Sequence, residues 1–572
     1  MSLTKTNQNI FSKAINAHED GRLKEAESLY RTILETTPAH PETCNYLALL
    51  LHSKGESETA LSFLEISLEA KPDDLDAQGN RAAILESLGE KDAAILQYRS
   101  ALENSPGNCD IALDLCRLLE AEGDLDAALA VAMSTREENP NDNQLQLETA
   151  RLLQENGRGA DAVTIMQNLI QTFPDNVDLK LQLGQLLQDL YRMDEAADQY
   201  HFAIKCEKTN ALAHYKLGRC LAEKGDWSDA VAMYRKALAL RPEQPEILLY
   251  LSRALNEVGE REEAIITCHR AYAAQPDYRG RDITLGILLL EAERYEEAAA
   301  EFHNAVEYHP TSVSVAALAQ CLLAQGHPLA ARKISDEHLK NSPGDTHVLV
   351  IHSLILEALQ DKKEVRRIVD FKNLLQQTYV DPPETFKTAD DFNSALAEHI
   401  LAHPSLTLSP PRNATRDGYH SGELFEEPMG PFSYFHTILE TAVTEYMAKM
   451  PTDPSHPFIL GAPQDWWLNA WAVVLDGPGR QISHAHNTAW LSGVYYVQLP
   501  TVINSGKDKE GWIEFGTPPP DFPVHLNPET FFIKPEVGKL VLFPGYMFHQ
   551  TIPTEVSERR ISVAFNVIPE LE

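Results

Sequence analysis

The sequence is poor in positive charge. Its 572 residues include 49 Lys and Arg against 84 Asp and Glu, which gives a formal net charge of -35. Most of the surface should therefore repel nucleic acid and anionic membranes, so we expect neither as a partner, although a local basic patch remains compatible with this charge.

Long apolar runs and paired cysteines are also missing. No uncharged stretch of about 18 apolar residues occurs, and the N-terminal segment lacks the apolar centre of a signal peptide. The seven cysteines are an odd number without Cys-x-x-Cys spacing, which favours reduced thiols over a disulfide framework. We therefore expect a soluble, cytoplasmic protein. Since single cores stop growing at about 250 to 300 residues, at least two units are expected.

Glycine, alanine and proline recur with a period of 34 residues. The glycines of this register are Gly21, Gly55, Gly89, Gly123, Gly157, Gly225 and Gly259, and Tyr191 and Glu293 take the glycine position in two further units. Five residues later stand Ala26, Ala60, Ala94, Ala128, Ala162, Ala196, Ala230, Ala264 and Ala298. The closing prolines are Pro38, Pro72, Pro106, Pro140, Pro174, Pro242, Pro276 and Pro310.

This pattern predicts one helical hairpin per unit. The glycine supplies the left-handed backbone that ends the first helix, the alanine lets the second helix pack closely, and the proline ends it. A further column of small residues lies seven positions before the glycine and includes Cys116, Gly184 and Gly286. These residues should fill close-contact positions between helices.

The repeat resembles the tetratricopeptide repeat family, over residues 7–344 as about ten units. Gly326, Ala331 and Pro343 mark the last unit, and residues 345–378 are expected to form a capping helical pair. The resemblance implies a curved superhelix whose concave face binds a peptide or another protein. The alternative is an array that serves only as a scaffold or a dimerisation surface.

Beyond about residue 380 the register is lost and the composition changes. Residues 403–425 are rich in Pro, Ser and Gly and predict an irregular lead-in, and residues 430–450 have the apolar spacing of an amphipathic helix. Short strand-like segments follow at 467–475, 491–499, 511–516, 530–535, 538–544 and 559–567. Such strands predict a sandwich or small barrel of the jelly-roll type.

Three histidines of this region form a candidate metal site. His484 and His486 are two residues apart, and residues at this spacing in a strand project to the same face. His549 ends another strand-like run and can meet them if the strands face each other. Three converging imidazoles suit a transition metal such as iron.

The order of motifs adds to this evidence. His-x-His, "SGVYYV", "FPGYMFHQTIP" and "ERRISVAFNV" follow one another, and over about residues 405–569 they resemble the double-stranded β-helix of the iron(II), 2-oxoglutarate-dependent oxygenases. The resemblance implies domains at 7–344 for the repeats, 345–402 for capping helices and linker, and 403–572 for the oxygenase. It also implies Fe(II) and 2-oxoglutarate as cofactors, with His484 and His549 as ligands.

In those enzymes the second ligand is usually a carboxylate, a position that His486 occupies here. Two readings stay open: His486 binds the metal as a third imidazole, which we favour, or it orients substrate or water. Asp476 is a possible substitute carboxylate, although its spacing does not align it with the histidines.

The co-substrate's distal carboxylate requires a fixed cation, and a guanidinium can bind it through two parallel charge-assisted hydrogen bonds. The resemblance places this arginine about ten residues after the distal histidine, in an Arg-x-Ser pattern. Arg560 and Ser562 fit that pattern, and Arg559 is the fallback. The competing interpretation gives Arg560 a surface ion pair with Glu558.

Further pocket residues are assigned by the same resemblance. A tyrosine hydroxyl is expected near the co-substrate, for which Tyr496 fits better than Tyr495. Asn469 and Trp471 lie on a neighbouring strand and are candidates to line the pocket.

The sequence therefore predicts a 2-oxoglutarate-dependent dioxygenase that hydroxylates a protein or carrier-bound substrate recruited by the repeats. The alternative is a non-catalytic scaffold for protein–protein interaction, with a degenerate barrel. A third reading is a metal-dependent dioxygenase that does not use 2-oxoglutarate. The sequence specifies neither the substrate nor the oligomeric state.

Overall fold

The computed structural model describes residues 3–278, 283–409, 413–425, 429–505, 509–520, 522–554 and 558–570. Its contacts divide the chain into two compact units, Met1–Leu221 and Ala222–Glu572. Among the described residues, no helix combines the length and the apolar character needed to cross a membrane. The domain limits predicted at residues 344 and 402 rest on changes of sequence pattern and stay predictions.

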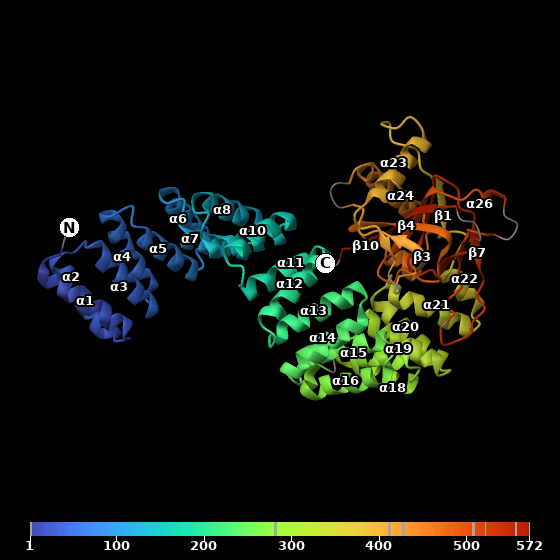
Figure 1. The fold of residues 1–572 in the computed structure, drawn as a ribbon, viewed down its shortest axis with the longest axis horizontal. Helices are drawn as coiled ribbons and strands as arrows, with labels where there is room; N and C mark the ends of the chain where they lie inside the picture. Colours follow the sequence, from blue (N-terminus) through green and yellow to red (C-terminus); the bar gives the residue numbers. More distant parts are fainter. Residues whose placement is uncertain are drawn as a thin grey trace. The chain divides into compact units, whose positions relative to one another are not determined.

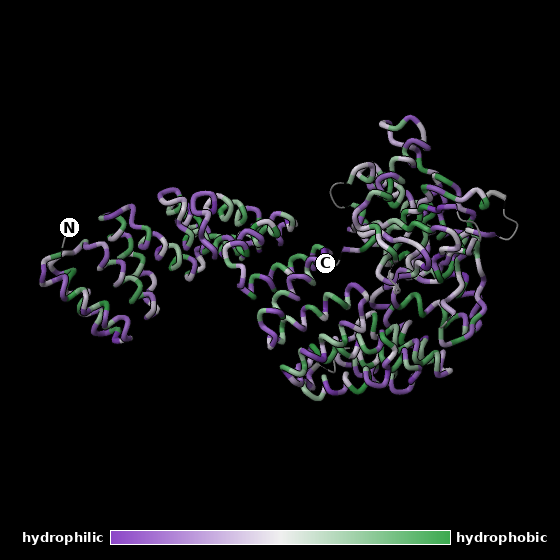
Figure 2. The backbone as a smooth tube through the Cα atoms, viewed as in Figure 1, coloured by the Kyte–Doolittle hydropathy of each residue, from purple (hydrophilic) through white to green (hydrophobic). Residues whose placement is uncertain are grey.

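The first unit consists of antiparallel helical hairpins (Figure 1). Its helices are α1 (Lys5–Glu19), α2 (Leu23–Thr36), α3 (Pro41–Ser53), α4 (Ser57–Ala70), α5 (Leu75–Ser87), α6 (Lys91–Asn104), α7 (Cys109–Ala121), α8 (Leu125–Glu138), α9 (Asn143–Glu155), α10 (Gly159–Thr172), α11 (Val177–Asp189), α12 (Met193–Cys206) and most of α13 (Ala211–Lys224). Hydrophilic and hydrophobic residues alternate along these helices (Figure 2), as expected when one face of each helix is buried.

The structure confirms the role of each repeated position. The register glycines have φ between 73° and 87°, and the alanines five residues later are 0% exposed. Tyr191 and Glu293 keep the left-handed conformation, with φ of 58° and 59°. In the small-residue column, a Cβ on Gly184 would lie 2.5 Å from the Tyr200 ring, so only glycine fits there without displacing the ring.

A further repeated feature escaped the sequence analysis. At the 34-residue period, the residue before the first helix of a unit accepts a hydrogen bond from the backbone N–H three residues later, which caps the helix. The capping residues are Asp74, Asn108, Asp142, Asn176 and Asn210. The signal was present as a column of Asp and Asn at fixed spacing.

The second unit begins with further hairpins and continues into a sheet-rich domain. Its helices are α14 (Trp227–Leu240), α15 (Pro245–Glu257), α16 (Arg261–Ala274), the short η1 (Pro276–Tyr278), α17 (Thr284–Glu291), α18 (Tyr295–Tyr308), α19 (Ser312–Ala324), α20 (Pro328–Asn341), α21 (Thr346–Ala358), α22 (Lys362–Ile368), α23 (Ala389–Ala402), α24 (Phe432–Lys449), α25 (Pro457–Leu460) and α26 (Val502–Ser505). The helix expected at 430–450 is therefore present as α24.

Two antiparallel sheets form the β part of this unit. The strands are β1 (Gln376–Tyr379), β2 (Thr407–Leu408), β3 (Thr415–His420), β4 (Trp466–Gln481), β5 (Leu491–Gln498), β6 (Ile513–Phe515), β7 (Phe531–Ile533), β8 (Lys539–Pro544), β9 (His549–Thr551) and β10 (Arg560–Pro569). The larger sheet has the order β1-β8-β5-β10-β4-β3-β2 and the smaller one β7-β6-β9. A helical solenoid followed by a sheet-rich domain is the predicted fold class, and two such sheets are consistent with a jelly roll.

Two segments differ from the sequence prediction. Residues 376–379, placed at the end of a capping helical pair, form β1 and pair with β8, because that strand has a free edge. Residues 415–420, expected to be irregular, form β3 and pair with β4 across a register shift. Both strands depend on partners distant in sequence, which local composition does not reveal.

The last repeat helices share a core with the β domain. Phe548 is 8% exposed and packs in one apolar cluster with residues of α19, α20 and α21, to which Ala485 also contributes. The Thr346 hydroxyl at the start of α21 donates to the Asn487 carbonyl at 2.6 Å. Helix α21 is therefore part of the support for the histidine-bearing loop.

Candidate metal centre

His484, His486 and His549 are brought together from two separate segments. His484 and His549 form an antiparallel bridge, in which each backbone N–H donates to the other's carbonyl at 3.1 and 2.9 Å. One potential ligand atom from each of the three side chains lies within 4.8 Å of those of the other two. Among the described residues, a group of three or more His, Cys, Asp or Glu side chains close enough together to hold a metal ion is found here.

The His-x-His pair precedes β5, in agreement with the strand segment predicted at 491–499, but it does not have the strand geometry from which its convergence was predicted. It occupies the segment between β4 and β5, where a turn at Asn487 and Thr488 follows His486. The His486 N–H donates to the Gly545 carbonyl at 2.8 Å, so the backbone of the other segment fixes this residue. The side chains still converge, because both segments are held by pairing at Gly545 and His549.

Gly545 permits this close approach. A Cβ at this position would overlap the Ala489 carbonyl oxygen and would lie 2.8 Å from the His486 carbonyl oxygen. The Gly545 N–H also donates to the Trp490 carbonyl at 3.0 Å. The glycine in "FPGYMFH" is therefore a geometric requirement of the site.

Backbone carbonyls select the tautomer of two histidines. Nδ1 of His484 lies 2.8 Å from the Ile482 carbonyl oxygen, and Nδ1 of His549 lies 3.0 Å from that of Met547. A carbonyl can only accept, so each Nδ1 carries the proton and each Nε2 keeps its lone pair. This is the arrangement in which a histidine binds a metal through Nε2.

The environment keeps all three imidazoles neutral. Burial, followed by the nearby His484, lowers the pKa of His486 to about 3, against a hydrogen bond with Asn566 that acts in the opposite direction. Burial lowers the pKa of His484, and burial together with the two other rings lowers the pKa of His549 well below its usual range. Neutral imidazoles are the form that binds metal ions, so the site is prepared for a cation at neutral pH.

A narrow cavity adjoins the histidines and ends at Arg560. All three histidines, Tyr496 and Arg560 contribute to its lining. The volume that the centre of a water molecule can occupy is about 20 Å³, which is room for roughly one water. Arg560 is 6% exposed, and Nη1 donates to the Gly511 carbonyl at 2.8 Å, whereas Nε has no hydrogen-bond partner. No carboxylate of the described residues forms an ion pair with Arg560.

Tyr496 lies beside this guanidinium. The Arg560 guanidinium carbon is 5.2 Å from the centroid of the Tyr496 ring, and the tyrosine hydroxyl is buried without a hydrogen-bond partner. Burial raises the pKa of Tyr496 to about 12, and the charge of Arg560 acts against this rise. Burial also lowers the pKa of Arg560, but a guanidinium stays protonated at neutral pH. The cavity thus holds a cation and a hydroxyl with unused hydrogen-bonding capacity.

The alternatives left open by the sequence lie elsewhere. Arg559 is 42% exposed in its side chain and pairs with Asp476 at 2.7 Å, so neither residue is part of the histidine group. Glu558 accepts hydrogen bonds from Thr501 and not from Arg560. The neighbouring Tyr495 turns away, and its hydroxyl donates to Asn393 at 2.7 Å.

Of the remaining predicted residues, Trp471 contacts a histidine of the site, whereas Ser562 and Asn469 do not line the cavity. Ser562 is buried on β10 and pairs in register with Tyr496, but it does not line the cavity. Asn469 has a buried amide oxygen without a partner, also outside the cavity lining. Trp471 stacks on His486 with ring centroids 5.7 Å apart and also stacks on His420 at 5.8 Å. The sequence pattern does not indicate that His420 lies here, because its place on β3 depends on pairing with β4.

Comparisons with known proteins agree with this division of the chain. Residues 469–566 match a family model described as "Putative 2OG-Fe(II) oxygenase". Two models of the tetratricopeptide repeat also match. One covers residues 87–152, 221–281 and 289–350. The other covers residues 47–108, 147–204 and 181–231. The search of curated proteins gave no match to the chain.

Solved structures give only distant similarities. Yeast Tom70 is 15% identical, with a TM-score of 0.30 and coverage of 63% of this chain and 97% of its own. The Naa15/Naa10 complex bound to HypK-THB is 17% identical, with a TM-score of 0.34 and coverage of 78% and 72%. YrrB, a TPR protein with an unusual peptide-binding site, is 19% identical, with a TM-score of 0.28 and coverage of 32% and 95%.

These structural similarities carry no argument about function, and the matched family models define the architecture. The chain is built from tetratricopeptide repeats followed by a C-terminal domain that matches the 2OG-Fe(II) oxygenase family.

Proposed function

We propose that the protein is an Fe(II)- and 2-oxoglutarate-dependent dioxygenase that hydroxylates a protein or carrier-bound substrate. The observation that carries this proposal is the combination of three neutral imidazoles with a buried arginine that lacks an anionic partner. The donor set fits iron, because imidazole nitrogen is a ligand that iron accepts. The orphaned Tyr496 hydroxyl and Arg560 Nε fit an anionic co-substrate.

In this mechanism His484, His486 and His549 hold the metal. The Ile482 and Met547 carbonyls fix two of the rings in the tautomer that presents Nε2. When bound, the iron couples oxidative decarboxylation of 2-oxoglutarate to hydroxylation of a C–H bond. Arg560 binds the distal carboxylate of the co-substrate, and Tyr496 donates a hydrogen bond beside it.

Three neutral ligands leave the site without the negative charge that a carboxylate ligand would give. Surrounding groups then decide how firmly the metal is held. Trp471 restrains the His486 ring by stacking, and Asn566 forms a hydrogen bond with His486. Because the cavity is narrow, co-substrate entry requires movement of lining side chains.

The repeat array supplies the second part of the proposal. We infer that it recruits the substrate, so that a high effective concentration compensates for weak contacts near the iron. The seven free cysteines support the expected cytoplasmic location, where thiols stay reduced.

Succinate formation from 2-oxoglutarate by iron-loaded protein tests the function. Wild type should produce succinate with bound iron near one equivalent, and His549→Ala should lose both. Stoichiometric iron without succinate formation would favour the third reading, and absence of both would favour a non-catalytic scaffold. His525→Ala is the matched control, because His525 lies outside the histidine group and the cavity lining.

A further inference from the structure

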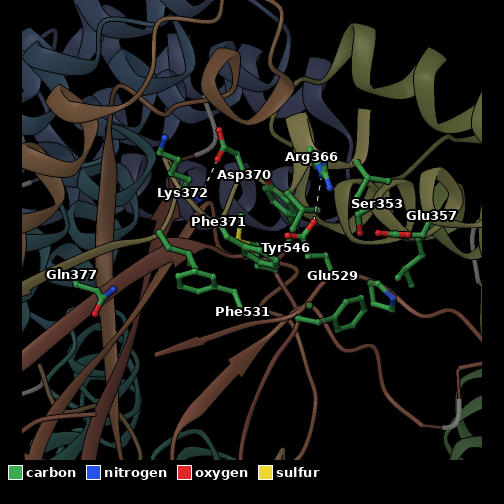
Figure 3. A pocket seen from close by; sticks show the side chains of 18 residues that line it. Ser353, Glu357, Arg366, Asp370, Phe371, Lys372, Gln377, Glu529, Phe531 and Tyr546 are labelled. Carbon is green, nitrogen blue, oxygen red and sulfur yellow. Dashed lines mark hydrogen bonds and ion pairs between the residues drawn. The ribbon is translucent and has the colours of Figure 1, made fainter. Parts of the chain in front are cut away.

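A second and larger cavity lies in the same unit, behind the segment that carries His549. It has a volume of about 470 Å³ and is enclosed by α21, α22 and the segment that follows them, together with loops of the β domain (Figure 3). This volume falls within the range of about 300 to 1,000 Å³ that is typical of ligand-binding pockets. The proposed function leaves this cavity without a role.

The body of the cavity is apolar and aromatic. Phe371 and Phe531 stack with ring centroids 5.7 Å apart, and Phe531 remains 38% exposed. Tyr546 contributes its ring only, because its hydroxyl donates to the Ile368 carbonyl at 2.5 Å. These surfaces suit an aliphatic chain, because each CH₂ group buried against them is removed from water.

One carboxylate in the cavity is uncompensated. Glu529 pairs with Arg366 at 3.5 Å, and the Asp370 side chain is occupied by hydrogen bonds to Lys372 N and to Asn373. The carboxylate of Glu357, on α21, forms neither a hydrogen bond nor an ion pair with any described residue. Burial, followed by the charge of Glu529, raises the pKa of its carboxyl, against a weaker opposing effect of Lys362.

The charges are distributed unevenly across the cavity. Glu357 and Ser353 lie at one side of the view together with Arg366, whose charge is paired with Glu529, and Lys372 and Gln377 lie at the other (Figure 3). A ligand that places a cation near Glu357 with its apolar body along the aromatic rings keeps that cation away from Lys372. The net charge of -35 also attracts basic ligands over long range.

We propose that this cavity anchors a lysine or arginine side chain of the polypeptide substrate, with the charged group at Glu357 and the aliphatic stem along the stacked rings of Phe371 and Phe531. Long basic side chains combine an apolar stem with a positively charged end. The cavity offers an apolar surface for the stem and a carboxylate for the charged end. The aromatic rings add attraction for the cation itself.

The position of the cavity connects this anchor with the metal centre. Met547 and Phe548 form part of the cavity wall, and the Met547 carbonyl accepts the hydrogen bond from His549 Nδ1 at 3.0 Å. An anchored polypeptide therefore contacts the segment that orients a metal ligand. The role of the anchored polypeptide as substrate rests on the proposed function. The binding of a basic side chain in the cavity does not.

Binding is tested on the metal-free full-length protein by calorimetry with three probes that share one apolar body: hexylamine, hexanol and hexanoate. Hexylamine should bind about tenfold more tightly than hexanol, since one hydrogen bond to a charged group is worth at least about 1.4 kcal/mol. Hexanoate should bind most weakly. Preference for hexanoate would assign the head-group site to Lys372 and overturn the proposal, as would equal binding of all three probes.

Variants locate the interaction. Glu357→Gln keeps the shape of the side chain and should reduce the preference for hexylamine over hexanol to within about twofold. Phe531→Ala should weaken all three probes together. Glu445→Gln is the matched control, because Glu445 lies on α24 in an exposed pair with Lys449, outside the cavity. An unchanged preference in Glu357→Gln would refute the assignment.

A peptide arm separates a protein substrate from a free amine. A short capped peptide with one central lysine should bind about tenfold more tightly than the same peptide with norleucine. Equal binding of the two peptides, with hexylamine still preferred, would overturn the polypeptide assignment in favour of a small amine. Lysine-peptide binding by a protein that forms no succinate would keep the cavity assignment and refute the oxygenase function.

Discussion

Arg560 provides the sharpest test of the co-substrate site, because the chain contains a neighbouring arginine with the opposite environment. Arg560 is 6% exposed and has no carboxylate partner, whereas Arg559 is exposed and pairs with Asp476 at 2.7 Å. Replacing each by methionine removes one guanidinium while keeping an unbranched apolar stem. The two variants differ in whether the lost charge faced the cavity.

The expected magnitude follows from the two hydrogen bonds that a guanidinium offers a carboxylate. At about 1.5 kcal/mol for each charge-assisted bond, Arg560→Met should lose about 3 kcal/mol, a rise of roughly 150-fold in the Kd for 2-oxoglutarate. Arg559→Met should change that Kd by less than about twofold, since an exposed ion pair contributes at most about 1 kcal/mol, and only to folding.

Calorimetric titration of 2-oxoglutarate into Mn(II)-loaded protein without oxygen measures this binding in the absence of turnover. A second measurement checks the reasoning on charge: an unpaired buried cation is costly, so Arg560→Met without co-substrate should unfold at the same temperature as wild type or higher. Retained 2-oxoglutarate affinity in a folded Arg560→Met protein would refute the role of this residue.

Three further predictions concern the loop, the repeats and pH. Gly545→Ala forces a Cβ into the Ala489 carbonyl and should cost at least about 2 kcal/mol and most of the bound metal, measured by denaturation and metal content, whereas Gly79→Ala, with its nearest neighbour atom at 3.8 Å, should be tolerated. Tyr191→Gly should stabilise the first unit by about 1 kcal/mol by relieving the φ of 58°, and Tyr191→Ala, which keeps a Cβ, should not. The pKa of His486 is lowered from 6.5 to about 3 in the folded protein, so as pH falls the unfolded chain takes up the proton at a higher pH than the folded chain does. The free energy of unfolding is therefore highest above about pH 6.5 and decreases as pH falls below it. Metal-free protein should lose about 1.3 kcal/mol from this residue between pH 7 and pH 5.5, and urea denaturation of His486→Asn should show a correspondingly smaller loss.

Local patterns made the repeats predictable. Each unit specifies its own turn and close contact within 34 residues, and every position tested in this way has the expected conformation, including the left-handed Tyr191. The capping column is equally local, at Asn108 and its equivalents, but both Asp and Asn occur in it, so it is less regular than the glycine and alanine columns.

The histidine group was predictable as a set of residues but not in its backbone setting. The triad was identified from spacing and motif order, yet His486 lies in a loop held by Gly545, a contact between segments far apart in sequence. The choice between Arg559 and Arg560 depended on which face of β10 meets the cavity, and strand phase cannot be read from composition. The position of His420 beside Trp471 likewise required the pairing of β3 with β4.

The hydrogen bond from Thr346 to the Asn487 carbonyl, and the packing of Phe548 against the helices before it, limit where this chain can be cut. A fragment that starts at residue 403 would lack the helix beneath the loop that bears His486 and would also lose the edge strand paired with β8. Repeats from the start of the chain can be exchanged without touching the three histidines. The final hairpins have to be inherited together with the β domain.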